Sequence, residues 1–169
     1  MNSLVNSTVL SNFAAVDQLP LLRMVTGKLY LPVEVYDEII AGQLAGYAFY
    51  DGIDQHISPT TETGWLELVT MSAAELLLFL ELPSNLHRGE GACLSIARQR
   101  GWGFLSDDRA ARATATAWGI SVSGTLGVLL LAIEDGHLTT ENGNRILQRM
   151  IREARYHSPF SDLGLLLRM

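Results

Sequence analysis

The sequence predicts an α/β protein with one parallel sheet that carries helices on both faces. Two observations support this prediction: short apolar, strand-like runs alternate with helical patterns, and no repeat or interdomain linker interrupts the alternation. The chain has 169 residues, of which 48% are hydrophobic and 18% charged, enough for one domain with a buried core. We therefore expect a single domain over residues 1–169, with an irregular or inserted segment at about 46–64.

The N-terminal half predicts three strands and their helices. A strand ends at Val5 and a helix begins near Thr8. The run KLYLP is a second strand that Pro32 stops, and WLELVT is a third. Ser72 and Glu75 have the spacing of a capping box at the start of the next helix. For the helix over 33–44 we expect one inward face made of Val33, Tyr36, Ile40 and Leu44.

The C-terminal half continues the alternation. A helix over 90–101 ends at Gly101 and leads into the strand WGFLS. The helix DDRAARATATAWG, the strand ISVSG and the helix TLGVLLLAIEDG follow. Thr139 or Thr140 then caps a last amphipathic helix, and the tail SPFSDLGLLLRM forms an extended piece and a short apolar turn.

Charge and composition exclude several classes of protein. A net charge of −6 argues against a broad basic surface for nucleic acid. The single cysteine, Cys93, rules out an intramolecular disulfide and is expected in the core. No apolar run is long enough to span a bilayer, and the N-terminus does not have the pattern of a secretory signal. We expect a cytoplasmic protein with no membrane contact.

Polar residues gather where the predicted strands end. Asn6 follows the first strand, and Asp107 and Asp108 follow the fourth. Ligands of parallel sheets bind at this carboxyl edge, and Glu38 and Glu90 lie in helices near it. Clustered carboxylates repel one another unless a cation is present, and oxygen ligands favour Mg²⁺ or Mn²⁺. Such ions activate water and polarise phosphate, so the pattern indicates phosphodiester hydrolysis.

Competing chemistries have little support in the sequence. The four histidines lack the spacing of a zinc site, and there is no dinucleotide-binding glycine motif or P-loop. There is no nucleophile elbow, and the fifth strand does not end in the lysine of a receiver-type phospho-acceptor site.

Each acidic residue also has a structural explanation that the sequence leaves open. Asp107 or Asp108 can be a helix N-cap, and Glu90 can complement a helix dipole. Glu38 can lie on a solvated helix face, as Glu34 and Asp37 are expected to do even more readily.

The basic residues also have more than one explanation. His87, Arg88 and Arg109 can contact RNA phosphate or form ordinary surface, and the i,i+4 spacing of Arg112 favours an ion pair with Asp108. A basic stripe on the last helix can be solvated, bind RNA or face an acidic partner; it contains Arg145, Arg149, Arg152 and Arg155.

Five segments together resemble PIN-domain proteins, and the resemblance is closest to bacterial relatives of the VapC toxins, in a branch catalogued as a domain of unknown function. In chain order the segments are VNSTVLSNFA, LYLPVEVYDEI, GEGACLSIA, LSDDRAAR and SGTLGVLL. The resemblance covers nearly the whole chain except about 46–64. It implies a three-layer α/β/α sandwich and an Mg²⁺- or Mn²⁺-dependent ribonuclease. It also implies an RNA substrate, a small antitoxin partner and a homodimer.

The resemblance assigns roles to individual residues. Glu38, Glu90 and Asp108 match the family's acids, and Asp107 stands beside the last of them. Thr8 and Ser106 match hydroxyl residues that support the site. The implied metal ligands are Asn6, Glu90 and Asp108.

The sequence departs from the family pattern at Asn6, where the family has an aspartate. An amide oxygen can bind a hard cation but brings no charge, so metal affinity is expected to fall. Three explanations stay open: the branch tolerates asparagine, the nuclease is degenerate, or the residue was replaced to silence the enzyme. The alternative function is a catalytically weakened PIN fold that binds nucleic acid or protein.

Overall fold

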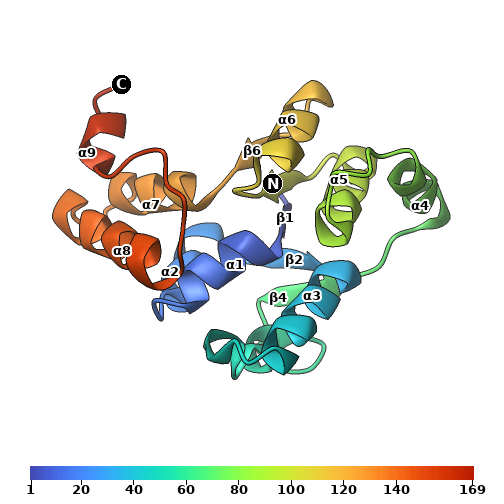
Figure 1. Cartoon of the computed structure of the whole chain (residues 1–169), viewed down its shortest axis with the longest axis horizontal. Coiled ribbons are helices and arrows are strands. Elements are labelled where there is room, and N and C mark those ends of the chain that lie inside the picture. The colour runs from blue at the N-terminus through green and yellow to red at the C-terminus, as the bar shows by residue number, and fades with distance from the viewer.

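The computed structural model describes residues 1–169 and contains one sheet of six parallel strands in the order β3-β4-β2-β1-β5-β6. Helices cover both faces, which gives the three layers visible in Figure 1. The parallel α/β/α fold predicted from the sequence is therefore confirmed. The strands are β1 (Ser3–Val5), β2 (Leu29–Pro32), β3 (Ile57–Ser58), β4 (Leu66–Val69), β5 (Gly103–Leu105) and β6 (Val122–Ser123).

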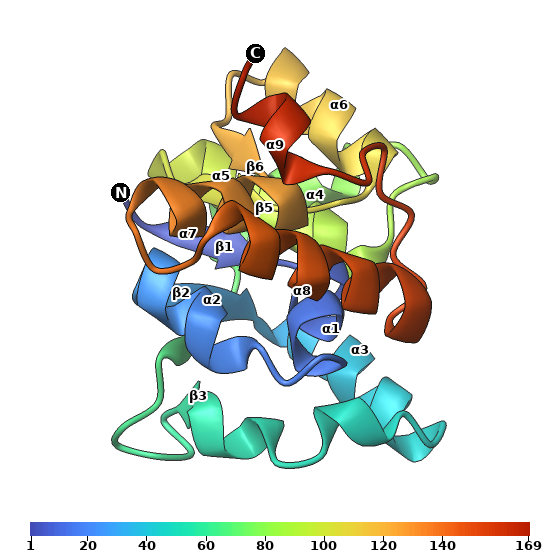
Figure 2. The same cartoon turned by 90° about the vertical axis from the view of Figure 1, so that its left-hand side faces the viewer.

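The helices separate into two layers according to their mutual contacts. One layer contains α1, α2, α7 and α8, and the other contains α3, α4, α5 and α6 (Figures 1 and 2). The short helix α9 packs on α7 and α8. The bounds are α1 (Ser7–Ala14), α2 (Leu19–Thr26), α3 (Val33–Leu44), α4 (Ala73–Leu80), α5 (Arg88–Arg100), α6 (Arg109–Ala117), α7 (Thr125–Glu134), α8 (Thr140–Glu153) and α9 (Leu163–Leu166), with short 3₁₀ turns η1 (Ala48–Tyr50) and η2 (Ile53–His56).

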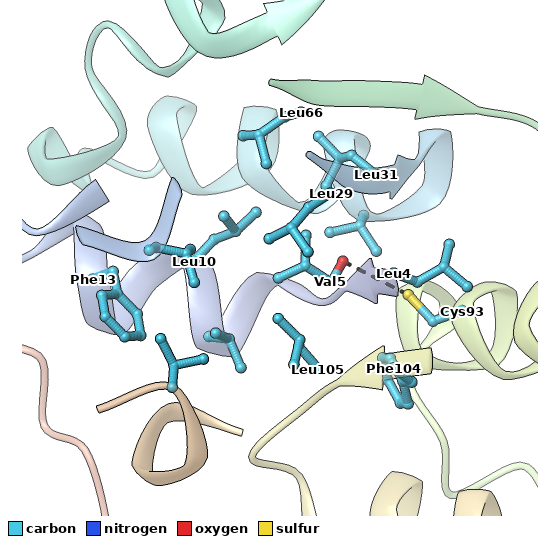
Figure 3. Close-up of a cluster of buried hydrophobic side chains, with 14 of the residues drawn as sticks. Leu4, Val5, Leu10, Phe13, Leu29, Leu31, Leu66, Cys93, Phe104 and Leu105 are labelled. Carbon is cyan, nitrogen blue, oxygen red and sulfur yellow. Dashed lines mark hydrogen bonds between the residues drawn. The ribbon is translucent and has the colours of Figure 1, made fainter. Parts of the chain in front are cut away.

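The core lies along the central strands, as Figure 3 shows. Because helices cover both faces of the sheet, successive residues of one strand are buried on opposite sides, which explains the continuous apolar runs. Cys93 on α5 is buried there as expected, and its thiol donates a 3.7 Å hydrogen bond to the carbonyl of Val5. The labelled core includes Leu4, Val5, Leu10, Phe13, Leu29, Leu31, Leu66, Phe104 and Leu105.

The helix caps follow the local sequence signals. The predicted capping box forms at α4, where Ser72 accepts from the N–H of Glu75 and Glu75 accepts from the N–H of Ser72. Thr139 caps α8, and Gly101 adopts the left-handed conformation that ends α5. No helix combines the length and apolarity needed to cross a membrane.

The segment 46–64 and the region before β2 hold elements that the sequence analysis does not predict. Residues 48–58 form η1, η2 and the edge strand β3, which pairs in parallel with β4. The sheet therefore has six strands rather than five. The helix α2 is also unpredicted; Pro20 in its first turn needs no N–H donor there, so it does not interrupt the helix.

The expected inward face of α3 is wrong. The residues buried on this helix are Val35, Ile39 and Gly42, whereas Leu44 is 85% exposed. Apolar side chains occur on several sides of α3, so the packing against α5 decides which side is covered. The expectation of a fully solvated Glu34 is also wrong, because its Oε2 is buried and makes no hydrogen bond.

Candidate active site

The carboxyl ends of β1 and β5 bring three polar residues together. These two strands are neighbours, and Val5 is paired with Leu105, so the residues that follow them meet at the same edge. The Asn6 Nδ2 donates to Ser106 Oγ at 2.9 Å, and the same Oγ accepts from the backbone N–H of Asp108 at 3.1 Å. Ser106 thus connects the first strand to the turn before α6.

Asn6 is 1% exposed, and both the oxygen and the nitrogen of its amide make hydrogen bonds within the chain. Asn6 is the N-cap of α1. Its Oδ1 accepts a hydrogen bond from the N–H of Val9 at 3.2 Å and one from the hydroxyl of Thr8 at 2.8 Å. Its Nδ2 donates to Ser106. Both predicted supporting residues, Thr8 and Ser106, therefore contact Asn6. The Asn6 oxygen already has two donors and has no free lone pair for an ion in this arrangement.

Asp108 is the N-cap of α6. Its Oδ1 accepts from the N–H of Ala111 at 2.8 Å, while its Oδ2 makes no hydrogen bond within the chain. The capping explanation is correct, but it uses only one of the two carboxylate oxygens. The other oxygen is available to a ligand at the carboxyl edge.

Glu90 lies in the first turn of α5 and is 4% exposed. Its Oε2 accepts from the N–H of His87 at 3.0 Å, and the His87 Nδ1 lies 3.6 Å from its Oε1. Burial raises the pKa of Glu90, and the negative charges of Asp108 and Glu38 raise it further, although the His87 N–H opposes the shift. The structure thus places the charges of Asp108 and Glu38 close enough to Glu90 to affect its pKa.

Glu38 is half-buried between α3, α1 and α5. Its Oε1 accepts from the N–H of Gly89 at 2.9 Å, and its Oε2 accepts from the Ser7 hydroxyl at 2.8 Å. A Cβ at position 89 would lie only 2.7 Å from Oε1, so glycine is required for this close approach. Neither partner was predicted from the sequence, in which the glycine before Glu90 is the one available signal.

Asp107 has its carboxylate turned toward α7 and α1. Its Oδ1 accepts from the N–H of Thr125 at 2.8 Å, and its Oδ2 accepts from the Thr125 hydroxyl at 2.5 Å and from Asn12 Nδ2 at 3.1 Å. Asn12 is 5% exposed and also donates to the Thr125 hydroxyl. Asp107 therefore joins three segments of the chain, and the sequence analysis does not identify either partner.

The predicted basic residues take different positions. His87, Arg88 and Arg109 are exposed at the N-terminal ends of α5 and α6. The expected ion pair between Arg112 and Asp108 does not form. The Arg112 Nη1 instead donates to the Ser106 carbonyl at 2.9 Å, because Asp108 faces the amides that it caps.

The basic stripe of α8 is partly neutralised by the helix's own acids. Arg145 pairs with Glu141, and Arg149 pairs with Glu153 at 3.0 Å. The C-terminal end of the stripe lies near the carboxyl edge, where Arg155 and Asp108 line the same hollow.

The chemistry of the acidic side chains fits one hard cation. No three acidic, histidine or cysteine side chains are gathered closely enough to form a metal cage. Mg²⁺ commonly needs only one or two carboxylates, with water and substrate phosphate completing its shell. Glu90 and Asp108 each offer an oxygen free of backbone hydrogen bonds, which meets that requirement.

The fold and this edge define a class: α/β/α proteins with an acidic site at the carboxyl end of a parallel sheet. A family model described as a PIN domain matches residues 3–161, and the chain belongs to the PIN-domain family. PIN domains are in general nucleases that bind RNA and use divalent metal ions. The comparison with curated proteins found no match.

Proposed function

We propose that this protein is an Mg²⁺- or Mn²⁺-dependent endoribonuclease. The observation that supports the proposal best is the proximity of Glu38, Glu90 and Asp108, of which Glu90 has a pKa raised by burial and by the charges of the other two. Carboxylates that disfavour one another's ionised state gain free energy when a cation joins them.

The residues have separate tasks in this proposal. Glu90 and Asp108 would hold the ion, which would supply positive charge to the phosphate and lower the pKa of a bound water. Glu38, fixed by Ser7 and Gly89, adds negative charge beside them and presents a rigid acceptor for a water proton. Asp107 positions the Asp108 turn through Thr125 and takes no part in the chemical step.

The exposed cations complete the proposed site. His87 and Arg88 at the start of α5, and Arg109 at the start of α6, lie beside Glu90 and Asp108 in the chain. The positive charges of Arg88 and Arg109 and the ring N–H of His87 favour an RNA phosphate, which the net charge of −6 would otherwise repel. We further propose a cytoplasmic toxin that acts as a homodimer and that a small antitoxin protein restrains.

A second candidate function follows from Asn6. Because its amide is neutral and its oxygen already accepts two hydrogen bonds, the first strand supplies no charge and no free oxygen to the site. This observation favours a PIN fold of weakened activity that binds RNA or protein without cutting it.

A metal-titrated cleavage assay distinguishes the two candidates. A labelled single-stranded RNA is incubated with the wild-type chain and with Asp108→Asn, which keeps a capping oxygen for α6 but loses the charge. Cleavage by the wild type that requires Mn²⁺ or Mg²⁺ and that the variant lacks supports the nuclease. RNA binding without cleavage at any metal concentration supports the binding module.

A further inference from the structure

Two hollows beside the acidic edge share a wall and form one groove. The first has a volume of about 300 Å³ and lies between the start of α1, the Asp107–Asp108 turn and the chain after α8. The second, of about 240 Å³, continues toward the start of α7. Asp107, Tyr156 and His157 border both hollows. Figure 1 shows this part of the chain running back from the end of α8 to α9.

We propose that this groove binds the single-stranded RNA that flanks the cleaved phosphate, an inference that rests on the proposed nuclease function. The groove begins at Asp108, one of the proposed metal ligands, and leads away from it along the C-terminal segment. An RNA chain that is bound at the acidic edge has to continue away from it on the protein surface. The groove provides such a path, because ten residues line one hollow, nine line the other, and three of them border both.

The charges along the groove favour an anion. Arg155 and His157 line the first hollow and are exposed, while Arg112 lines the second. The carboxylate of Asp107, which also borders the groove, already accepts three hydrogen bonds from Thr125 and Asn12. Its charge is therefore largely compensated. Asp108 adds a negative charge to the first hollow, and the two arginines of the groove, Arg112 and Arg155, offset it.

The lining also favours a nucleic acid over an apolar peptide. Only two or three of the residues around each hollow are hydrophobic, so neither offers an extended apolar surface. Tyr156 is half-buried between the two hollows and offers the one aromatic ring of the groove. Aromatic rings beside cations are the usual elements of single-strand binding, because every base can stack on a ring.

Arg155 provides a clean test because its backbone lies in the left-handed region, with φ of 54°. It directly follows the C-cap of α8, the position at which glycine is preferred. Arg155→Gly therefore removes the cation while relieving backbone strain, and the fold should be retained. Arg155→Lys keeps the charge. Arg145→Gln is the matched control, since it removes the same charge from an exposed part of α8 outside the groove.

The experiment measures the affinity of a fluorescent single-stranded RNA of about 10 nucleotides by anisotropy, with chelator present. Salt is varied from about 50 to about 200 mM, because each lost phosphate contact lowers the slope of log K against log salt by about 0.7. We expect this decrease and severalfold weaker binding for Arg155→Gly. Arg155→Lys and Arg145→Gln should keep the wild-type slope.

The outcomes separate this proposal from the nuclease proposal. An unchanged slope for Arg155→Gly, or an equal decrease for Arg145→Gln, overturns the groove even if the wild type cleaves RNA with Mn²⁺. A decrease specific to Arg155→Gly supports the groove even if no RNA is cleaved, in which case the nuclease proposal fails alone. A wild-type chain that binds no RNA overturns both.

Discussion

Asp107→Asn should destabilise the fold, although asparagine has almost the same shape as aspartate. Both oxygens of Asp107 accept hydrogen bonds: Oδ1 from the Thr125 N–H, and Oδ2 from the Thr125 hydroxyl and Asn12 Nδ2. An asparagine must place its NH₂ at one of these positions. There it faces either the Thr125 N–H or the Asn12 NH₂, both of which are obligatory donors.

The size of the effect follows from these contacts. The variant loses at least one hydrogen bond to a charged acceptor and leaves a partly buried donor unpaired, which costs about 2 kcal/mol. For a domain of this size, each kcal/mol corresponds to about 2–4 °C in the melting midpoint. We expect the midpoint of Asp107→Asn to fall by about 4–8 °C.

Asp108→Asn is the matched control, one residue further along the same turn. Asp108 uses only Oδ1 as an acceptor, so asparagine can cap α6 equally well and the midpoint should change little. Thermal unfolding followed by circular dichroism, together with RNA cleavage at a temperature where both variants are folded, gives the comparison. We expect Asp107→Asn to be less stable but active, and Asp108→Asn to be stable but inactive.

The reverse pattern would refute the reasoning. If Asp107→Asn melted like the wild type and had lost all cleavage, Asp107 would act directly on the substrate. Its hydrogen bonds to Thr125 and Asn12 would then be of little energetic consequence.

Three further predictions concern metal, position 6 and pH. Millimolar Mn²⁺ should raise the melting midpoint relative to chelator. The free energy of unfolding should increase by about 2.7 kcal/mol if the ion concentration is 100-fold above its Kd, and an unchanged midpoint would contradict the metal site. Asn6→Asp should lower the Kd for Mn²⁺ measured by calorimetry. With chelator the variant should be slightly less stable than the wild type, because its buried charge has only the hydroxyls of Ser106 and Thr8 and one backbone amide as partners. Glu75→Gln should cost about 2 kcal/mol near pH 7, because it breaks the two-bond pair with Arg100. Burial raises the pKa of Glu75, but the Arg100 bonds and the Ser72 amide outweigh burial and lower it. This stabilisation therefore exists above the ordinary glutamate pKa and is lost as the pH falls through the lowered pKa. Denaturant titrations of the wild type and Glu75→Gln should differ near neutral pH and converge at acidic pH.

Local signals made much of the fold predictable. The capping box of Ser72 and Glu75, and the cap at Asp108, depend on residues three apart, so their spacing is visible in the sequence. The alternation of strands and helices likewise requires no knowledge of tertiary contacts. By contrast, the buried side of α3 depends on which neighbour covers it, and the position of Leu44 was predicted wrongly for that reason.

The candidate site was predictable in its acids but not in their partners. Glu38, Glu90 and Asp108 follow from strand ends and from the family resemblance. The donors that orient Glu38 are separated from it by 31 and 51 residues, and no local pattern identifies such distant pairs. The same holds for Asn12, which contacts Asp107 across 95 residues.

The place of β1 in the sheet has a consequence for biosynthesis. The first strand to be made is a central one, paired with β2 on one side and with β5 on the other. While the chain is being synthesised from the N-terminus, the β5 side of β1 stays open until residues 103–105 have emerged. A fragment that ends before Gly103 therefore exposes an apolar strand edge, which is prone to pair with other chains. Such a fragment also lacks Ser106 and Asp108, so the proposed nuclease site cannot form before the strand edge is covered.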